Sequence, residues 1–389
     1  MQTFTTLLDP FPLETFLEKY WTREGLVIPG TDADRFGHLF DWESLNNYLN
    51  FYPLKFPEVR VSKSGQTLPE AKRPQELIEQ CRAGGTLVVD RLHERVKAIA
   101  EWVAQLRIEL GHRCQVNSYC SFPGHQGFSR HFDSHEVFIL QLSGHKHWRV
   151  FSDTFVYPLA EHRSSQFTPP ETDPYIDIIL HPGDLLYIPR GHWHYAIAVD
   201  EPSLHLTLGI DCQTGIDFSD WLTRELQEFP QWRESLPLLN PDGRENCRKH
   251  LRNLVQNWMN LLESDKFIDR YLDEQLLQGQ PPVQFGFPAQ MGYDIFPHGD
   301  RTQFYRPPQP VQISELAETD KYEIKTGGKK ISLKGIEKSV LERIFVATEF
   351  DGLDVRKWLP GFDWETEIVP FLSRLVKAGI LIVRSDRID

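Results

Sequence analysis

Seven short runs rich in β-branched and aromatic residues, placed between positions 113 and 210, constrain the fold more than any other feature of this chain. Turn-forming Gly, Pro, Asp and Ser residues separate them. Many short strands at regular spacing, with turn signals between them, predict a β-sandwich or barrel. The runs are CQVNSYCSF, EVFILQL, HKHWRVF, YIDIIL, DLLYIP, HYAIAV and LHLTLGI.

Helical patterns precede this strand-rich region, so an α+β protein is expected. The run FLEKYWTREG, residues 16–25, predicts a short amphipathic helix that stops at Gly25. The run GGTLVVD, residues 84–90, predicts a strand, and residues 93–111 predict a helix closed by Gly111. We expect residues 1–212 to form one domain.

The apolar residues change to a helical period after residue 212. On one helix face lie Leu251, Leu254, Val255, Trp258, Leu261 and Leu262. This stripe either packs on the preceding domain or forms a dimer interface, because Trp and Leu are concentrated in a few turns. We expect residues 213–290 to be a helical dimerisation region and the chain to be a homodimer.

A proline-rich stretch with little periodicity, over residues 281–313, predicts a linker. After it, KYEIKTGGKKISL predicts a hairpin that turns at Gly327 and Gly328. Helical patterns follow around residues 337–348, 355–359 and 371–379, and ILIVR predicts a closing strand. This order is typical of a winged helix, so residues 291–389 are expected to hold the linker and a winged-helix-like domain.

Charge and cysteine content narrow the class of protein. The formal net charge of -13 disfavours a general nucleic-acid binder and favours a basic partner or a small substrate. Five scattered cysteines without a CxxC pair indicate neither a disulfide framework nor a structural zinc site. The N-terminus lacks a signal-peptide pattern and no run of about 20 apolar residues occurs, so we expect a cytoplasmic protein that does not enter a membrane.

Eleven of the fifteen histidines lie between His112 and His205, and some have the spacing of metal ligands. His131 and Asp133 are two residues apart, hence on one face of an extended segment. A later strand and turn lead to His192 and His194, either of which can supply a second imidazole. Two imidazoles and a carboxylate form the facial triad that leaves positions open on Fe(II) for a co-substrate and O₂. Each histidine alone is more simply a surface or hydrogen-bonded residue, but together they predict a metal centre.

Strand alternation predicts an interior cation. In HKHWRVF, Lys146, Trp148 and Val150 share the face expected to point inward. A buried ammonium is costly unless it meets an anion. Lys146 therefore either reaches the barrel rim or binds the distal carboxylate of a dicarboxylate co-substrate. Asn117 and Tyr119 lie in an inward polar row, where they can bind the same anion or form a network around the lysine.

At these residues the chain resembles the JmjC-type, cupin-4 ribosomal oxygenases. The resemblance rests on NSYCSFPGHQGFSRHFDSHEVFILQLSGHKHWRVF, PGDLLYIPRGHWHYA and SLHLTLG. These runs contain N-x-Y, HxD-x-x-E-VF, G-x-K-x-W and P-x-G-x-x-H in family order. The helical and C-terminal regions match more loosely. The resemblance implies a double-stranded β-helix core, of the jelly-roll, cupin or JmjC type, as the catalytic domain in residues 1–212.

The resemblance also implies an activity. These enzymes are Fe(II)- and 2-oxoglutarate-dependent oxygenases that hydroxylate proteins, so the implied substrate is a His or Arg side chain of a basic ribosomal protein. The implied iron ligands are His131, Asp133 and His194, and the implied co-substrate residues are Lys146 as anchor with Asn117 and Tyr119. Related enzymes often carry Ser or Thr near the co-substrate where this chain has Gly209.

Rival interpretations stay open. A non-oxygenase metal-binding cupin needs no buried lysine. The same chemistry on an N-methyl group would demethylate it, and an RNA substrate is compatible with the motifs. An inert barrel with a nucleic-acid-binding tail is the last alternative. Because the C-terminal region is nearly neutral, we do not expect direct nucleic-acid binding.

Overall fold

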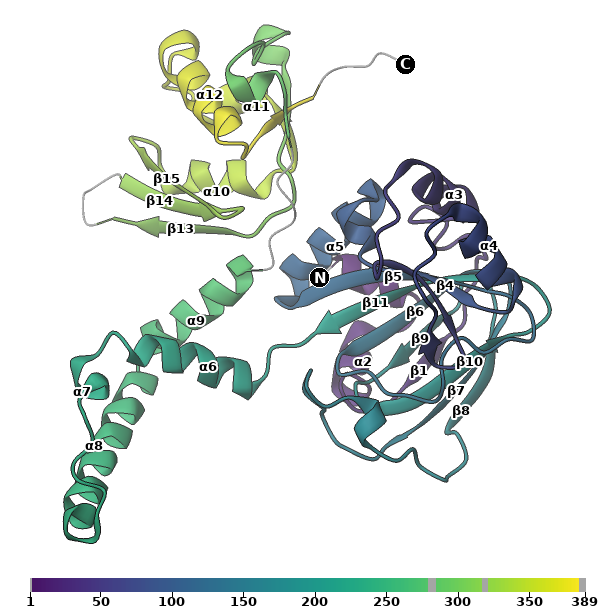
Figure 1. Cartoon of the computed structure of the whole chain (residues 1–389). Helices are drawn as coiled ribbons and strands as arrows, with labels where there is room; N and C mark the ends of the chain where they lie inside the picture. The colour runs from purple at the N-terminus through teal and green to yellow at the C-terminus, as the bar shows by residue number, and fades with distance from the viewer. Residues whose placement is uncertain (1, 279–284, 317–320, 385–389) are drawn as a thin grey trace. The chain divides into compact units, whose positions relative to one another are not determined.

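The computed structural model describes residues 2–278, 285–316 and 321–384 (Figure 1). The chain divides into two compact units. The first comprises residues 1–212, 281–309 and 343–389, and the second residues 213–280 and 310–342. In the described part of the chain, no helix has both the length and the apolar character that crossing a bilayer requires.

The helices are α1 (Gln2–Leu8), α2 (Leu13–Lys19), α3 (Trp42–Phe51), α4 (Pro74–Arg82), α5 (Lys97–Leu110), α6 (Gly215–Leu226), α7 (Pro230–Arg233), α8 (Arg244–Leu262), α9 (Asp265–Gln278), α10 (Lys338–Val346), α11 (Gly352–Trp358) and α12 (Val369–Lys377). The strands are β1 (Leu26–Ile28), β2 (Val59–Lys63), β3 (Gln66–Thr67), β4 (Thr86–Val89), β5 (Arg113–Ser121), β6 (Glu136–Ser143), β7 (Lys146–Asp153), β8 (Ile176–Leu180), β9 (Leu185–Ile188), β10 (His192–Ala198), β11 (Ser203–Asp211), β12 (Gln303–Tyr305), β13 (Val311–Glu315), β14 (Lys321–Thr326), β15 (Lys329–Lys334), β16 (Glu349–Asp351) and β17 (Ile382–Val383).

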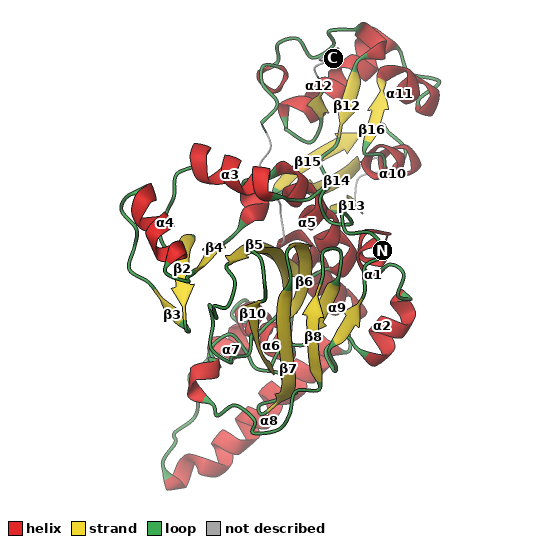
Figure 2. Cartoon of the chain, turned by 90° about the vertical axis from the view of Figure 1, so that its right-hand side faces the viewer, coloured by secondary structure: helices red, strands yellow, loops and turns green. Residues whose placement is uncertain are grey.

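Two antiparallel sheets form the strand-rich part of the first unit (Figure 2). The larger has the order β1-β9-β6-β11-β5-β4-β2-β3, and the smaller has the order β10-β7-β8. The seven strands predicted between residues 113 and 210 are β5 to β11, and the prediction is confirmed. The predicted strand at 84–90 is β4. The predicted helix at 93–111 is α5, which Gly111 closes with a φ of 67°.

The two faces of the larger sheet pack against different partners. Phe138 of β6 contacts Phe4 and Phe16 of the N-terminal helices at ring-centroid distances of 5.8 Å. Ile139, the next residue, points the other way and packs in a cluster with Trp148 of the smaller sheet. Side chains alternate along a strand, so the larger sheet carries helices on one face and the smaller sheet on the other.

The helix predicted at residues 16–25 is wrong in extent. The observed α2 ends at Lys19, so Gly25 is not its stop. Thr22 has a φ of 62°, outside the helical range, and its N–H donates to the hydroxyl of Tyr187 at 2.8 Å. The turn is therefore held by a long-range contact with β9 that local sequence does not reveal.

Helices α6 to α9 occupy the region predicted to be helical after residue 212. The single stripe expected on α8 divides in two. Trp258 and Leu262 pack on a buried cluster that includes Trp221 of α6. Leu251 and Val255 instead are 44% and 49% exposed. Part of the apolar stripe is thus used within this unit and part remains at its surface.

Two small antiparallel sheets follow, in the orders β13-β14-β15 and β16-β12-β17. The predicted hairpin is β14 and β15, which turn at Gly327 and Gly328 with positive φ at both. Helices α10, α11 and α12 and strand β17 occupy the other predicted positions. The linker prediction over residues 281–313 is wrong where β12 pairs with β16 and β17, and its residues 281–284 lie outside the described residues. Three strand residues are too few to show a period.

Candidate active site

The structure brings His131, Asp133 and His194 together inside the barrel. His131 and Asp133 lie in the loop before β6, and His194 lies on β10. The backbones of the two histidines form an antiparallel bridge, with N–H to O distances of 3.1 and 2.7 Å. The potential ligand atoms of the three side chains all lie within 4.8 Å of one another. Their backbone positions are therefore fixed by pairing between two distant segments.

Hydrogen bonds orient both imidazoles. Nδ1 of His131 lies 2.7 Å from the carbonyl of Ser129, and Nδ1 of His194 lies 3.0 Å from the carbonyl of His192. A carbonyl only accepts, so each Nδ1 carries the proton and each Nε2 keeps its lone pair. Nε2 of His194 lies 3.7 Å from the Asp133 carboxylate. This arrangement is suited to binding a metal ion.

The charge states also suit a metal ion. Burial, followed by the neighbouring His131, lowers the pKa of His194 to about 4, so this imidazole is neutral near pH 7. Burial acts to raise the pKa of Asp133, but His135 and the other adjacent histidines bring it below its ordinary value. Metal ligation needs a neutral imidazole and an ionised carboxylate. Two imidazole nitrogens and one carboxylate match the facial triad that binds Fe(II).

His192, the other candidate for the second imidazole, points elsewhere. Its Nδ1 lies 2.7 Å from the hydroxyl of Tyr175. It is absent from the groups of metal-ligating side chains that gather in the described residues. The geometry therefore favours His194 over His192 at this position.

A second group of potential ligands differs in its setting. His145 Nδ1 lies 3.1 Å from Asp200 and 3.3 Å from Glu201, at turns next to β7 and β10. Both carboxylates are more than half exposed. Surface ion pairs of this kind are common, and this group offers one imidazole where the buried group offers two.

Lys146 enters the same cavity from β7. The cavity has a volume of about 230 Å³ and is lined by all three potential ligands, Lys146, Tyr119 and Trp148. Lys146 is 5% exposed, and its Nζ donates to Ser121 Oγ at 2.9 Å. Burial lowers its pKa from 10.5 to about 7. Among the described residues no carboxylate forms an ion pair with it, although Asp133 lines the same cavity, so Lys146 is an interior cation without a paired anion.

Tyr119 and Asn117 have different places. Tyr119 lines the cavity, and burial raises its pKa, so the phenol keeps its proton and can donate. Asn117 is not among the lining residues, and its side-chain oxygen accepts the N–H of Arg91 at 2.9 Å. Of the two expected helpers, only Tyr119 is at the cavity wall.

Sequence reasoning did not single out several other residues that line the cavity, among them Arg60, Thr86, His205 and Thr207. His205 is 2% exposed and stacks on Tyr119, with ring centroids 5.1 Å apart. Its Nδ1 finds no hydrogen-bond partner in the described part of the chain. Strand alternation in LHLTLG could have indicated His205 and Thr207, because they share a face with Gly209.

The structure explains why residue 209 is a glycine where related enzymes often carry Ser or Thr. A Cβ at this position would lie 2.4 Å from the His135 ring, so the side of the strand at Gly209 is filled by that imidazole. Thr207, two residues earlier on the same face, lines the cavity. The cavity that Lys146 lines thus has a threonine in its wall even though residue 209 has no hydroxyl.

Comparison with known proteins defines the class of this site. Residues 91–218 match the family model described as JmjC domain. The JmjC resemblance drawn from the motifs is therefore confirmed over this segment. The Escherichia coli ribosomal oxygenase YcfD superposes with a TM-score of 0.61 at 18% identity, over 96% of this chain and 98% of that one. The fold is thus the β-rich α+β fold of the JmjC and cupin type.

Particular relatives extend the similarity. Ribosomal oxygenase 1 of Bos taurus is 31% identical over 215 residues, which cover 53% of this chain and 32% of the relative. The "Bifunctional lysine-specific demethylase and histidyl-hydroxylase NO66" of Drosophila pseudoobscura pseudoobscura is 28% identical over 313 residues, which cover 72% of this chain and 32% of the relative. The chain spans less than half the length of these curated relatives.

Proposed function

We propose that this protein is an Fe(II)- and 2-oxoglutarate-dependent oxygenase that hydroxylates a protein side chain. The observation that carries the proposal is the cavity itself, where two imidazoles and a carboxylate share one space with an ammonium that has no ion-pair partner among the described residues. The metal ligands would be His131, Asp133 and His194, and Lys146 would hold the distal carboxylate of the co-substrate. A structure of YcfD was obtained with cobalt and 2-oxoglutarate, which supports the same pairing of ligands in this chain.

Bound Fe(II), with 2-oxoglutarate and O₂, supplies the oxidation that inserts one oxygen atom into a C–H bond while the co-substrate becomes succinate and CO₂. The chain's own residues position these groups. Lys146 would neutralise the distal carboxylate, Tyr119 would donate a hydrogen bond from the cavity wall, and Trp148 would line the wall with an apolar ring. The backbone bridge between His131 and His194 keeps the ligands in place when the co-substrate leaves.

For the substrate we propose a His or Arg side chain of a ribosomal protein. The names of the relatives, ribosomal oxygenase and histidyl-hydroxylase, support this class. Ribosomal proteins are basic, and a net charge of -13 favours their association. The carbon that is oxidised must reach the cavity beside Tyr119 and His131.

The proposal is tested by intact-mass analysis of ribosomal proteins incubated with the chain, Fe(II), 2-oxoglutarate and O₂. We expect one protein to gain the mass of one oxygen atom, at a residue that fragmentation then identifies. Lys146→Ala should abolish the dependence on 2-oxoglutarate. No mass gain and no 2-oxoglutarate consumption, or full activity in Lys146→Ala, would favour a non-oxygenase cupin instead.

A second activity, removal of an N-methyl group from lysine, is favoured by the name of the NO66 relative. Hydroxylation of the methyl carbon would release formaldehyde, so the same cavity would serve. Incubation of methyl-lysine peptides with the chain, followed by formaldehyde detection, separates this activity from stable hydroxylation.

We also propose that residues 213–290 form a dimerisation region in a homodimer. Leu251, Val255 and Met259 support this assignment, because they repeat every four residues on α8 and are 44–52% exposed. Light scattering should give a molecular mass of twice the chain mass. The variant Val255→Asp should reduce the measured mass to that of a single chain. For residues 291–389 we propose a winged-helix-like domain, supported by the order along the chain of β14, β15 and the helices α10 to α12; β14 and β15 belong to the second compact unit, and α11 and α12 belong to the first.

A further inference from the structure

A buried ion pair connects the end of one strand to a turn between two others. Glu136, the first residue of β6, is fully buried, and its Oε1 lies 3.7 Å from Nε of Arg190. Arg190 lies in the turn between β9 and β10, and its side chain is 14% exposed. A buried ion pair contributes little to stability, because both charges lose their hydration. Stability alone is therefore a poor explanation for this pair.

The pair joins the two segments that carry the candidate metal ligands. Asp133 precedes Glu136 by three residues, and His194 follows Arg190 by four. The backbones of the two segments are also in contact, because the N–H of Gly191 donates to the carbonyl of Asp133 at 2.9 Å. The ion pair thus adds a connection between side chains to one between backbones.

Glu136 is held firmly on the face of the larger sheet that the N-terminal helices cover. It shares this face with Phe138, two residues further along β6, which contacts Phe4. The hydroxyl of Tyr187 donates to Oε2 of Glu136 at 2.5 Å and accepts the N–H of Thr22 at 2.8 Å. Strand β6 is paired on both sides, with β9 and β11. Glu136 is thus a fixed point that can influence the cavity only through the backbone.

Arg190 belongs to a turn and not to a strand. Its guanidinium lies over the ring of Tyr157, 5.3 Å from the ring centroid. Nε of Arg190 and Oε1 of Glu136 both lack a hydrogen-bond partner among the residues that the structure describes. The two atoms lie 3.7 Å apart, so the attraction between their charges draws the turn toward the fixed end of β6.

We propose that Glu136 and Arg190 are positioning residues, which hold the turn before His194 against the loop of Asp133 so that the ligands converge on one metal ion. The inference rests on the proposed function, because it assumes that these side chains and His131 bind a metal. The carboxylate and one imidazole come from opposite sides of the connection, so its loss would let the distance between them vary. Residues that orient metal ligands typically change metal affinity by about 10–100-fold when they are replaced.

The test measures Co(II) affinity of the full chain by titration, the visible absorbance of the bound ion, which depends on its coordination geometry, and urea unfolding. Glu136→Gln removes the charge but keeps an oxygen for the Tyr187 hydroxyl, and Arg190→Met removes the cation. Asp184→Ala is the matched control. Its carboxylate is also buried, accepts the N–H of Gly30 at 2.7 Å and lies at the opposite end of β9.

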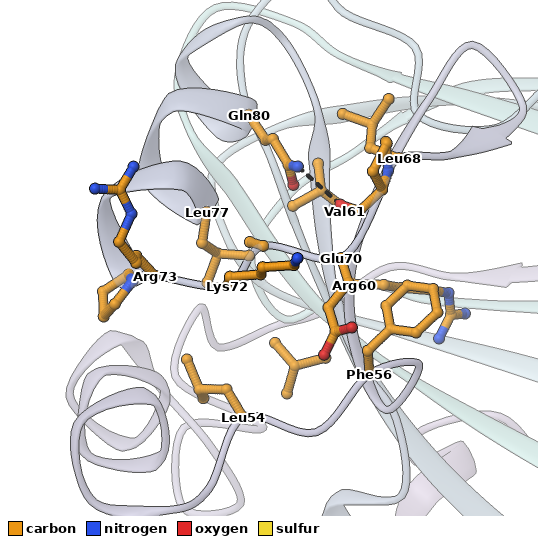
Figure 3. Close-up of a pocket in the computed structure, with 14 residues that line it drawn as sticks. Leu54, Phe56, Arg60, Val61, Leu68, Glu70, Lys72, Arg73, Leu77 and Gln80 are labelled. Carbon is orange, nitrogen blue, oxygen red and sulfur yellow. Dashed lines mark hydrogen bonds between the residues drawn. The ribbon is translucent and has the colours of Figure 1, made fainter.

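A second control breaks a connection between two segments that carry no candidate ligand. Gln80 of α4 donates to the carbonyl of Pro69 at 2.9 Å, beside a groove that Leu77 and Val61 also line (Figure 3). None of the candidate metal ligands lines this groove. Gln80→Ala should therefore leave Co(II) affinity unchanged.

We expect Glu136→Gln and Arg190→Met each to weaken Co(II) binding about tenfold and to shift the visible absorbance of the bound ion. Asp184→Ala should unfold at a lower urea concentration but bind Co(II) as the unaltered chain does. Equal losses of affinity in Asp184→Ala and the two test variants would assign the effect to lower stability and overturn the proposal.

The double variant Glu136→Gln/Arg190→Met separates positioning from stability. It leaves neither charge unpaired, so its unfolding midpoint should recover toward that of the unaltered chain. Its Co(II) affinity should stay about tenfold lower, without adding the two single losses, because the same connection is missing. Recovery of the affinity together with the stability would assign the pair a structural role alone and overturn the proposal.

The outcomes also distinguish this inference from the proposed function. Tight Co(II) binding by the unaltered chain, with equal affinity in Glu136→Gln and Arg190→Met, would overturn the positioning role and leave the proposed function intact. Failure of the unaltered chain to bind Co(II) would overturn the proposed function, and the positioning role with it.

Discussion

Burial of the Lys146 ammonium has a high cost in folding free energy. The ammonium is buried and donates to the Ser121 hydroxyl, and burial brings its pKa to about 7. An interior cation of this kind destabilises a fold unless an anion reaches it. The cost is consistent with a residue kept for binding, because a carboxylate in the cavity would restore its ordinary charge.

The binding of 2-oxoglutarate should therefore weaken above pH 7. The carboxylate binds the charged form of Lys146, and each pH unit above the pKa of about 7 reduces that form about tenfold. The apparent Kd should rise accordingly and level off below pH 7. Calorimetric titration of 2-oxoglutarate into the Co(II)-loaded chain measures it. Lys146→Arg stays charged, so its Kd should vary little with pH; an equal rise in both proteins would assign the effect to another group.

Two aspartates offer a direct contrast between the buried and exposed histidine groups. Asp133→Ala removes the carboxylate from a set with two oriented imidazoles, so we expect Co(II) affinity to fall by about 100-fold or more and turnover to be lost. Asp200→Ala alters only the exposed group and should leave both unchanged. Metal titration followed by absorbance distinguishes the two. Full activity in Asp133→Ala would refute its role as a ligand.

At the scale of elements, the turn between β6 and β7 sets where Lys146 enters the cavity. Gly144 in this turn has a φ of 67°, and a Cβ there would lie 2.1 Å from the carbonyl oxygen of Pro202. Only glycine avoids both the strained backbone conformation and the steric clash with Pro202, which directly precedes β11. The turn thus holds β7 in the register that pairs Lys146 with Ala198.

Gly144→Ala should destabilise the chain by about 3 kcal/mol or more. Gly111→Ala is the matched control, because Gly111 has the same φ of 67° but nothing within 4 Å of the added Cβ. The Gly111→Ala variant should lose only about 1–2 kcal/mol of unfolding free energy, because alanine disfavours the left-handed backbone conformation. Urea unfolding of both variants gives the difference, and equal losses would show that the contact with Pro202 is relieved by movement.

Much of the barrel could be predicted because its strands are bounded by turn residues and their side chains alternate. The same alternation assigned Lys146 to the interior. Arg60 could not be predicted, since β2 is remote from the motifs and reaches the cavity only through its pairing with β4. The stacking of His205 on Tyr119 likewise depends on the register of β11 with β5. Such register is set by long-range pairing and is not written in either strand alone.

Asn117 shows the opposite limit. Its place in the inward polar row followed from alternation, but the N–H of Arg91, 26 residues away in the chain, occupies its side-chain oxygen. Pattern reasoning identifies which face a side chain shares and not which partner it finds there. In the same way, alternation puts residues 207 and 209 on one face of β11 but does not reveal that Thr207, and not Gly209, lines the cavity.

At the scale of the whole molecule, long-range charge acts on the two proposed substrates with opposite sign. A net charge of -13 attracts a basic protein and repels the dianion 2-oxoglutarate. Lys146 offsets the repulsion only locally, inside the cavity. Because it is buried, that short-range attraction is screened less by salt than the field at the surface.

Salt should therefore slow the reaction with the protein substrate. From about 0.01 M to about 0.15 M salt the Debye length falls from about 30 to about 8 Å, so most of the surface field is lost. We expect kcat/KM for the basic substrate to fall about tenfold over this range, through the rate of association. Consumption of 2-oxoglutarate without protein substrate should not fall, because screening removes a repulsion. Stopped-assay rates across a salt series measure both, and parallel declines would indicate a general loss of activity in place of electrostatic steering.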